Sequence, residues 1–218
     1  MSGQKINIPM LGIFLGVVAA FSAGLLSLVY TSTADAIALN LQKKTNKALE
    51  QVLPPFDNVP ADETVVIRSE LDWPVKFYIA RKDGDIVGFA GEVISPEGFS
   101  GDITVMAGLE LDATIRTVIV TANTETPGLG TVIADRKMQK TIIDVVKGNR
   151  IEGLVPNHWL DQYARRKAGA NAWKVQKDGG DIDAKTGATI TSRAVCGAVY
   201  AVAQTAAENL DALAKGVE

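Results

Sequence analysis

Residues 10–30 form an uncharged run of apolar side chains near the start of the chain, MLGIFLGVVAAFSAGLLSLVY. About 20 apolar residues in a helix cross the hydrocarbon core of a bilayer, so the run predicts one membrane-spanning helix. The alternative is a cleaved signal peptide, because residues 34–36 read Ala-Asp-Ala, an Ala-x-Ala cleavage sequence. The apolar core of a signal peptide is only about 7–15 residues long, which favours a retained anchor.

The remainder of the 218-residue chain is long enough for one domain with its own core. The formal net charge is −3 and basic residues do not cluster, so we expect no nucleic-acid partner. Cys196 is the only cysteine and His158 the only histidine, so no disulfide, Cys-ligated iron–sulfur cluster or Cys-based zinc site can form within the chain. We predict neither a metal site nor a catalytic side chain, and any redox chemistry must then come from a cofactor.

The hydrophobic pattern predicts an α+β domain behind a helical stalk. Apolar residues recur at helical spacing from Thr33 to Leu53, and Pro54-Pro55 ends that helix. We therefore divide the chain into an anchor (1–31), a stalk and linker (32–63) and a domain (64–218). Five strands are expected to form an antiparallel sheet, with Asp83-Gly84 as a hairpin turn: 64–68, 76–82, 85–94, 102–110 and 114–121.

Helices and one further strand are expected after the sheet. The spacing predicts a helix from Val132 through Lys147, a short helix over 161–166 and a strand over 173–176. A long C-terminal helix follows, whose apolar stripe faces the core: Ile190, Ala194, Val195, Ala198, Val199, Val202, Ala206, Leu210 and Leu213.

The segment 183–189, DAKTGAT, leads into that C-terminal helix. The small residues Gly187 and Ala188 would leave backbone N–H groups and the positive end of a helix dipole open beside the hydroxyl of Thr189. Such a helix start is suited to a phosphate group. The alternative is structural, with Thr189 as an ordinary N-cap residue.

The pattern Asp-x-x-(Ser/Thr)-Gly-Ala-Thr in this segment resembles the signal at which a flavin transferase joins FMN to the last threonine through a phosphoester. Three further segments look like those of the G subunit of Rnf complexes: 125–130 (ETPGLG), 95–101 (SPEGFSG) and 173–181 (WKVQKDGGD). These membrane assemblies pass electrons between ferredoxin and NAD and couple the transfer to ion translocation. The similarity extends from the N-terminus to about residue 205. The C subunit of the sodium-pumping NADH:quinone oxidoreductase shares the flavin motif but is a longer chain, so we favour the Rnf family.

The resemblance implies FMN bound covalently to Thr189, a flavin transferase for maturation, and other subunits of a membrane complex as partners. Around the attachment point it implies roles in binding the cofactor for Thr186, Gly187, Ala188, Thr191, Asp183 and Lys177. The hydroxyls would donate to phosphate oxygens. Asp183 is equally readable as a solvated loop carboxylate. Lys177 could pair with the phosphate or the flavin ring, but a surface lysine is the more common explanation.

The loop 125–130 is the second expected part of the flavin site. Its glycines allow close backbone approach to a flat ring, and the resemblance makes Glu125, Thr126 and Leu129 flavin contacts. Without the resemblance, this loop would be read as a structural turn. Phe99 is a candidate stacking partner for the ring, with core packing as the alternative.

The function implied by the resemblance is electron transfer, in which the chain by itself is a carrier and the whole complex is the ion-translocating oxidoreductase. A membrane-anchored sensory module built on the same flavin domain is the alternative. The resemblance implies an inner-membrane protein whose domain lies on the periplasmic side. Lys43, Lys44 and Lys47 follow the span and only Lys5 precedes it, so the lysine count mildly favours the cytoplasmic side.

Overall fold

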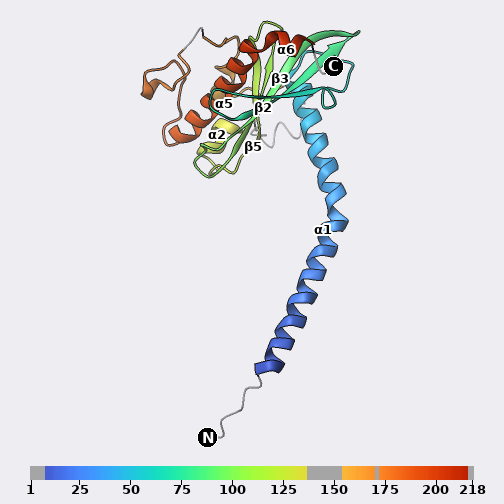
Figure 1. The fold of residues 1–218 in the computed structure, drawn as a ribbon. Coiled ribbons are helices and arrows are strands. Elements are labelled where there is room, and N and C mark those ends of the chain that lie inside the picture. Colours follow the sequence, from blue (N-terminus) through green and yellow to red (C-terminus); the bar gives the residue numbers. More distant parts are fainter. Residues whose placement is uncertain (1–7, 137–153, 170–171, 216–218) are drawn as a thin grey trace, which may run out of the picture. The chain divides into compact units, whose positions relative to one another are not determined.

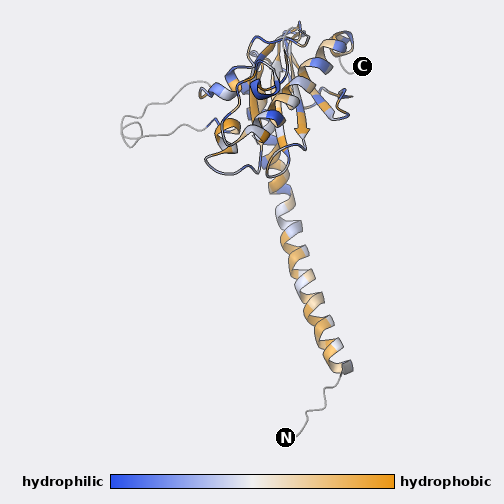
Figure 2. Cartoon of the chain, turned by 90° about the vertical axis from the view of Figure 1, so that its left-hand side faces the viewer, coloured by the Kyte–Doolittle hydropathy of each residue, from blue (hydrophilic) through white to orange (hydrophobic). Residues whose placement is uncertain are grey.

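The computed structural model describes residues 8–136, 154–169 and 172–215. The chain divides into two compact units, residues 1–44 and 45–218. Helix α1 (Ile8–Val52) begins in the first unit and ends in the second. It is long and apolar enough to cross a membrane, and hydrophobic residues dominate its N-terminal part (Figure 2). The helix ends just before Pro54-Pro55, which confirms that helix and stalk are continuous up to the two prolines.

The second unit contains a five-stranded antiparallel sheet, as the sequence predicts (Figure 1). Its strands are β1 (Thr64–Arg68), β2 (Pro74–Lys82), β3 (Asp85–Ser95), β4 (Ile103–Leu109) and β5 (Ile115–Ala122), in the order β1-β2-β3-β4-β5. The expected hairpin joins β2 to β3 through Asp83 and Gly84, which both have positive φ (53° and 90°). A two-residue loop with two positive φ angles is a type I′ turn, whose twist matches that of the strands.

A helix packs on each face of the sheet. On one face lies α5 (Thr189–Glu208), whose buried side chains, such as Val199 and Val202, share a core with Phe77 and Val105. On the other face the last turns of α1 bury Leu49 and Val52 against the sheet, in a second cluster with Tyr78, Ala80, Ala90, Met106 and Ile119. The sheet is therefore apolar on both faces, which explains why its central strands read as nearly continuous hydrophobic runs.

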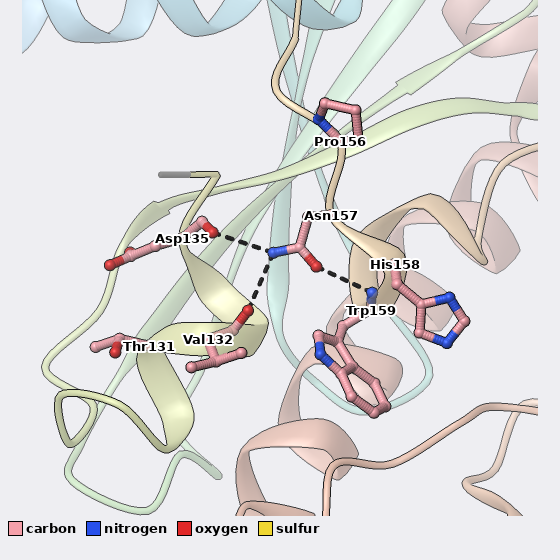
Figure 3. Close-up of a pocket in the computed structure, with 7 residues that line it drawn as sticks. All are labelled: Thr131, Val132, Asp135, Pro156, Asn157, His158 and Trp159. Atoms are coloured by element: carbon pink, nitrogen blue, oxygen red, sulfur yellow. Dashed lines mark hydrogen bonds between the residues drawn. The ribbon is translucent and has the colours of Figure 1, made fainter. Parts of the chain in front are cut away.

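The helices between the sheet and α5 differ from the prediction. Helix α2 (Gly130–Ala134) ends at Asp135, whose backbone is extended, so the helix expected from Val132 is wrong at residues 135–136; residues 137–153 lie outside the described part. Helix α4 (His158–Asp161) replaces the helix expected over 161–166. The side chain of Asn157 explains both boundaries (Figure 3). Its amide nitrogen donates to the carbonyls of Val132, Ile133 and Asp135, and its oxygen accepts from Trp159 N, so it binds the end of α2 and caps α4.

Two further predictions near the C-terminus are corrected. Residues 173–176 do not form a strand: only Val175 makes a bridge, to Ile182, and the 3-10 helix η1 (Gln176–Asp178) follows at once. The C-terminal helix is long, as expected, but it breaks at Asn209, and a short helix α6 (Leu210–Lys215) continues the chain. At the break the backbone of Asn209 leaves the helical region (φ −124°, ψ 23°), and its side-chain amide donates to the carbonyl of Thr205 (2.8 Å) at the end of α5.

Candidate flavin site

A pocket of about 260 Å³ lies where β4 begins and β5 ends, beside the start of α5. Three segments distant in the sequence line it: Phe99, then Glu125, Thr126, Leu129 and Gly130, then Gly187, Ala188, Thr189, Ile190 and Thr191. Phe99, Leu129 and Ile190 are exposed although they are large and apolar. An open pocket with an apolar rim and few polar groups is typical of a site for a flat organic ligand.

The start of α5 places the hydroxyl of Thr189 at this pocket. Thr189 is the first helical residue and Ala188 occupies the N-cap position, where no side chain among the described residues caps the helix. Thr189 is therefore not an N-cap residue, and the structural alternative for it is wrong. Gly187 has a φ of +85°, which a residue with a side chain rarely adopts, and this turn directs the chain into the helix.

A cation lies next to that hydroxyl. Lys177 Nζ, on η1, is 3.4 Å from Thr189 Oγ1. The next residue, Asp178, forms two hydrogen bonds of 2.7 Å with the guanidinium of Arg193 on α5. These bonds from Arg193, together with the charges of Lys174 and Lys177, hold the pKa of Asp178 below its usual range. The hydroxyl of Thr189 thus faces positive charge, which suits a phosphate group.

Glu125 connects the three segments that line the pocket. Its side chain is buried, with 5% of its surface exposed. One carboxylate oxygen accepts from the backbone N–H of Phe99 (2.7 Å) and the other from the hydroxyl of Thr191 (2.9 Å). A Cβ atom on Gly130 would lie 2.4 Å from the same carboxylate, so only glycine fits there. Glu125 therefore determines the shape of the pocket by holding Phe99 and Thr191 in place.

The loop 125–130 is a turn that exposes Leu129 to the pocket. The N–H of Leu129 donates to the carbonyl of Thr126, with Pro127 and Gly128 (φ +77°) between them. Proline followed by a glycine with positive φ is typical of a type II turn. Leu129 lies opposite Gly187: its Cδ2 atom is 3.6 Å from the position that a Cβ of Gly187 would take. The structural and the functional interpretations of this loop are thus compatible.

Of the predicted site residues, Lys177 contacts Thr189 without lining the pocket, and two others, Asp183 and Thr186, lie away from it. Asp183 accepts a hydrogen bond from Gln176 Nε2 (2.5 Å) and lies 3.3 Å from His158 Nε2, away from the residues that line the pocket. Its contacts hold η1 against the segment that precedes α5. Thr186 is exposed and is not part of the pocket lining among the described residues. Their proposed roles in binding FMN gain no support from this geometry.

Sequence reasoning missed Ile190 and left Phe99 open. The predicted core stripe of α5 includes Ile190, yet this residue is 46% exposed and lines the pocket. Phe99 is 65% exposed, so core packing is the wrong alternative for it. A helical stripe does not show which of its residues face the core and which line a pocket, although the neighbouring segment 183–189 could have indicated it.

A second pocket of about 410 Å³ lies beside α2 and α4 (Figure 3). Asn157 at its centre has hydrogen-bond partners for both of its side-chain polar atoms. Asn157 therefore fixes two helix ends. The described residues contain no group of His, Cys, Asp or Glu side chains suited to a metal ion.

The residues of the first pocket fit FMN. Phe99, Leu129 and Ile190 provide apolar surface for a flat ring, and the turn at Gly187 leaves room next to it. The hydroxyl of Thr189, the nearby Lys177 and the start of α5 provide the chemistry for a phosphate.

The fold and the pocket define the chain as a protein with an FMN-binding domain. The family model with that description matches residues 98–204, a range that contains every residue of the pocket lining. A second family model, the RnfG N-terminal region, matches residues 1–52 and so covers α1.

Several relatives share most of the chain. A protein of Photorhabdus laumondii, named as the G subunit of an ion-translocating oxidoreductase complex, is 36% identical over 93% of this chain and 93% of its own length. Proteins with the same name from Vibrio cholerae (35% identity, 86% and 85% coverage) and Pseudoalteromonas atlantica (34%, 86% and 83%) are similar. The chain therefore belongs to the family of G subunits of ion-translocating oxidoreductase complexes, which confirms the resemblance seen in its motifs.

Proposed function

We propose that this chain is a membrane-anchored electron carrier with FMN joined through its phosphate to Thr189. It transfers electrons between neighbouring subunits of an Rnf-type complex, which couples electron flow between ferredoxin and NAD to ion translocation. The names of the relatives support membership of such a complex. The match to the RnfG N-terminal region favours this role over a sensory module.

One observation carries the proposal: the Thr189 hydroxyl does not cap α5 and lies at an apolar pocket, with a cation 3.4 Å away. FMN, when bound, supplies the electron-transfer chemistry, and the protein supplies its position and electrostatic surroundings. In this proposal Leu129, Ile190 and Phe99 cover the ring and exclude water from part of it. Lys177 compensates the phosphate charge, and Glu125 holds the pocket segments together.

A relay has to exchange electrons with partners, so the isolated FMN-loaded chain should accept electrons without turning over ferredoxin and NAD. Stopped-flow absorbance of the flavin in the purified complex is the matching experiment. We expect the flavin on Thr189 to be reduced and reoxidised at least as fast as the complex turns over. Flavin reduction slower than turnover would contradict the relay role.

Leu129→Lys is expected to raise the flavin potential while FMN stays attached. Leu129 is 44% exposed and lines the pocket, so the new ammonium would favour the more negatively charged, reduced ring. At an effective dielectric constant of about 20, a charge roughly 8 Å away contributes about 2 kcal/mol, or about 45 mV for a two-electron couple, and exposure to solvent reduces this to an expected rise of ~20–40 mV. Spectroscopic redox titration measures it. Leu111→Lys, in the turn at the other end of β4, is the matched control and should leave the potential unchanged. An unchanged potential in Leu129→Lys would remove this loop from the ring site.

We propose a single membrane span near residues 10–30 with the domain on the periplasmic side, against the mild indication of the lysine count. Lys82→Cys, at the exposed end of β2, should then react with a membrane-impermeant maleimide in intact cells. The native Cys196 is a silent background, because it is 3% exposed and burial raises the pKa of its thiol to about 11. Labelling that appears only after the cells are lysed would place the domain in the cytoplasm.

A further inference from the structure

Lys177 lies beside the reacting hydroxyl because its loop is fixed on several sides. Before it, Gln176 donates its N–H to the carbonyl of Ile182 (2.9 Å). After it, Gly179 turns the chain with a φ of +82°, and the N–H of Gly180 returns to the carbonyl of Val175 (3.2 Å). These bonds make the segment 175–182 a closed loop. In the segment 177–181 (KDGGD), only the lysine belongs to the candidate flavin site. The rest of the segment has a structural role, because it closes the loop that holds this lysine.

The ion pair between Asp178 and Arg193 fastens this loop to α5. Arg193 is four residues after Thr189, so the pair joins η1 to the helix that carries the attachment hydroxyl. It also pairs the carboxylate of Asp178, the residue after Lys177, with a guanidinium. Within the described part of the chain, Lys177 has no carboxylate at ion-pair distance, and its ammonium contacts Thr189 Oγ1 at 3.4 Å. The ammonium group therefore remains able to interact with an incoming anion.

We propose that Lys177 is a catalytic residue for the attachment of FMN to this chain, supplied by the acceptor protein itself. The inference rests on the proposed function, because it requires Thr189 to be the acceptor. The ammonium orients Oγ1 and neutralises charge on the phosphoryl oxygens while the new bond forms. Asp178 and Arg193 are positioning residues, because they act only through Lys177.

The reaction is a phosphoryl transfer without change of oxidation state. Thr189 Oγ1 gives its proton to a base of the transferase and bonds to the phosphorus of the flavin nucleotide. The bond from that phosphorus to the bridging oxygen of a pyrophosphate-linked flavin dinucleotide breaks, and a nucleoside monophosphate leaves with the electron pair. An activated dinucleotide is required because a phosphate monoester does not condense with a hydroxyl group in water. The positive charge of Lys177 stabilises the negative charge on the phosphoryl oxygens during the transfer.

The test is the rate at which the purified full-length chain takes up flavin from a flavin dinucleotide in the presence of purified flavin transferase. In-gel fluorescence and intact mass give initial rates at several concentrations of the chain. For Lys177→Met we expect kcat to fall by about 10- to 100-fold with KM for the chain unchanged, because one preorganised charge at the reacting atoms is lost. Lys177→Arg should restore a large part of kcat. Asp178→Asn should give a smaller loss than Lys177→Met.

Lys174→Met is the matched control, since Lys174 is an exposed lysine that precedes the same loop. Its rate should equal that of the wild type. Equal kcat in Lys177→Met and wild type, a change in KM alone, or an equal loss in Lys174→Met would each overturn the inference. Circular dichroism tests whether each variant is folded. If Lys177→Met is not folded, Lys177→Arg is the second variant to measure, because it keeps the positive charge. Wild-type protein that takes up no flavin would overturn the proposed function as well, whereas normal loading of the wild type and of Lys177→Met would overturn only the role of Lys177.

Discussion

Thr189→Val is expected to abolish covalent flavin while the protein still folds. Valine has nearly the shape of threonine but no hydroxyl, so the acceptor oxygen of the phosphoester is lost. Thr189 is the first residue of α5 and its hydroxyl does not cap the helix, so the substitution leaves the helix start intact. After co-expression with a flavin transferase, we expect no in-gel flavin fluorescence from this variant and strong fluorescence from the wild type.

Thr186→Val is the control for this experiment. Thr186 lies in the same motif but is exposed and outside the pocket lining in the described structure, so its variant should remain fluorescent. Retained fluorescence in Thr189→Val, or its loss in Thr186→Val alone, would show that another hydroxyl is the acceptor.

Glu125→Ala is expected to destabilise the domain by about 3 kcal/mol and to loosen the Phe99 loop. The change removes a buried carboxylate that accepts from Phe99 N and Thr191 Oγ1, and it leaves both donors without this partner. It also leaves a cavity beside Gly130. Denaturant unfolding measures the loss, and faster amide hydrogen exchange at Phe99 locates it.

Glu97→Ala is the matched control, because Glu97 is an exposed carboxylate in the loop that follows β3. We expect it to change the free energy of unfolding by less than about 0.5 kcal/mol. Glu125→Gln keeps the volume and one acceptor oxygen, so its effect should lie between the two. A loss of stability in Glu125→Ala no larger than in Glu97→Ala would contradict the role of Glu125 in joining the pocket segments.

The sheet and its two flanking helices were predictable because their signals are local and repeated. Alternating or continuous β-branched runs gave all five strands, and Asp83-Gly84 gave a hairpin turn. The bounds of the helices between the sheet and α5 were not predictable, because the side chain of Asn157 determines where α2 ends and where α4 begins. Propensity within a short window does not contain that contact.

The parts of the candidate site that are continuous motifs were predictable from the sequence. The parts that depend on contacts between distant segments were not. The segment 183–189 and the loop 125–130 are both found from the sequence, and the structure brings Thr189 and Leu129 into one pocket. The role of Glu125 depends on hydrogen bonds to residues 26 and 66 positions away in the sequence. The position of Lys177 depends on the ion pair between its neighbour Asp178 and Arg193 of α5. Asp183 shows the opposite case, since it belongs to the motif but contacts Gln176 and His158.

The most direct test of the central claim is peptide mass spectrometry of the chain purified from cells that contain a flavin transferase. Trypsin cleavage after Lys185 and Arg193 releases residues 186–193, which contain Thr186, Thr189, Thr191 and Ser192. Fragmentation of this peptide separates the four hydroxyls. We predict one FMN phosphoester, located on Thr189. An unmodified peptide together with flavin that is released when the protein is denatured, or an FMN located on one of the other three residues, would contradict it.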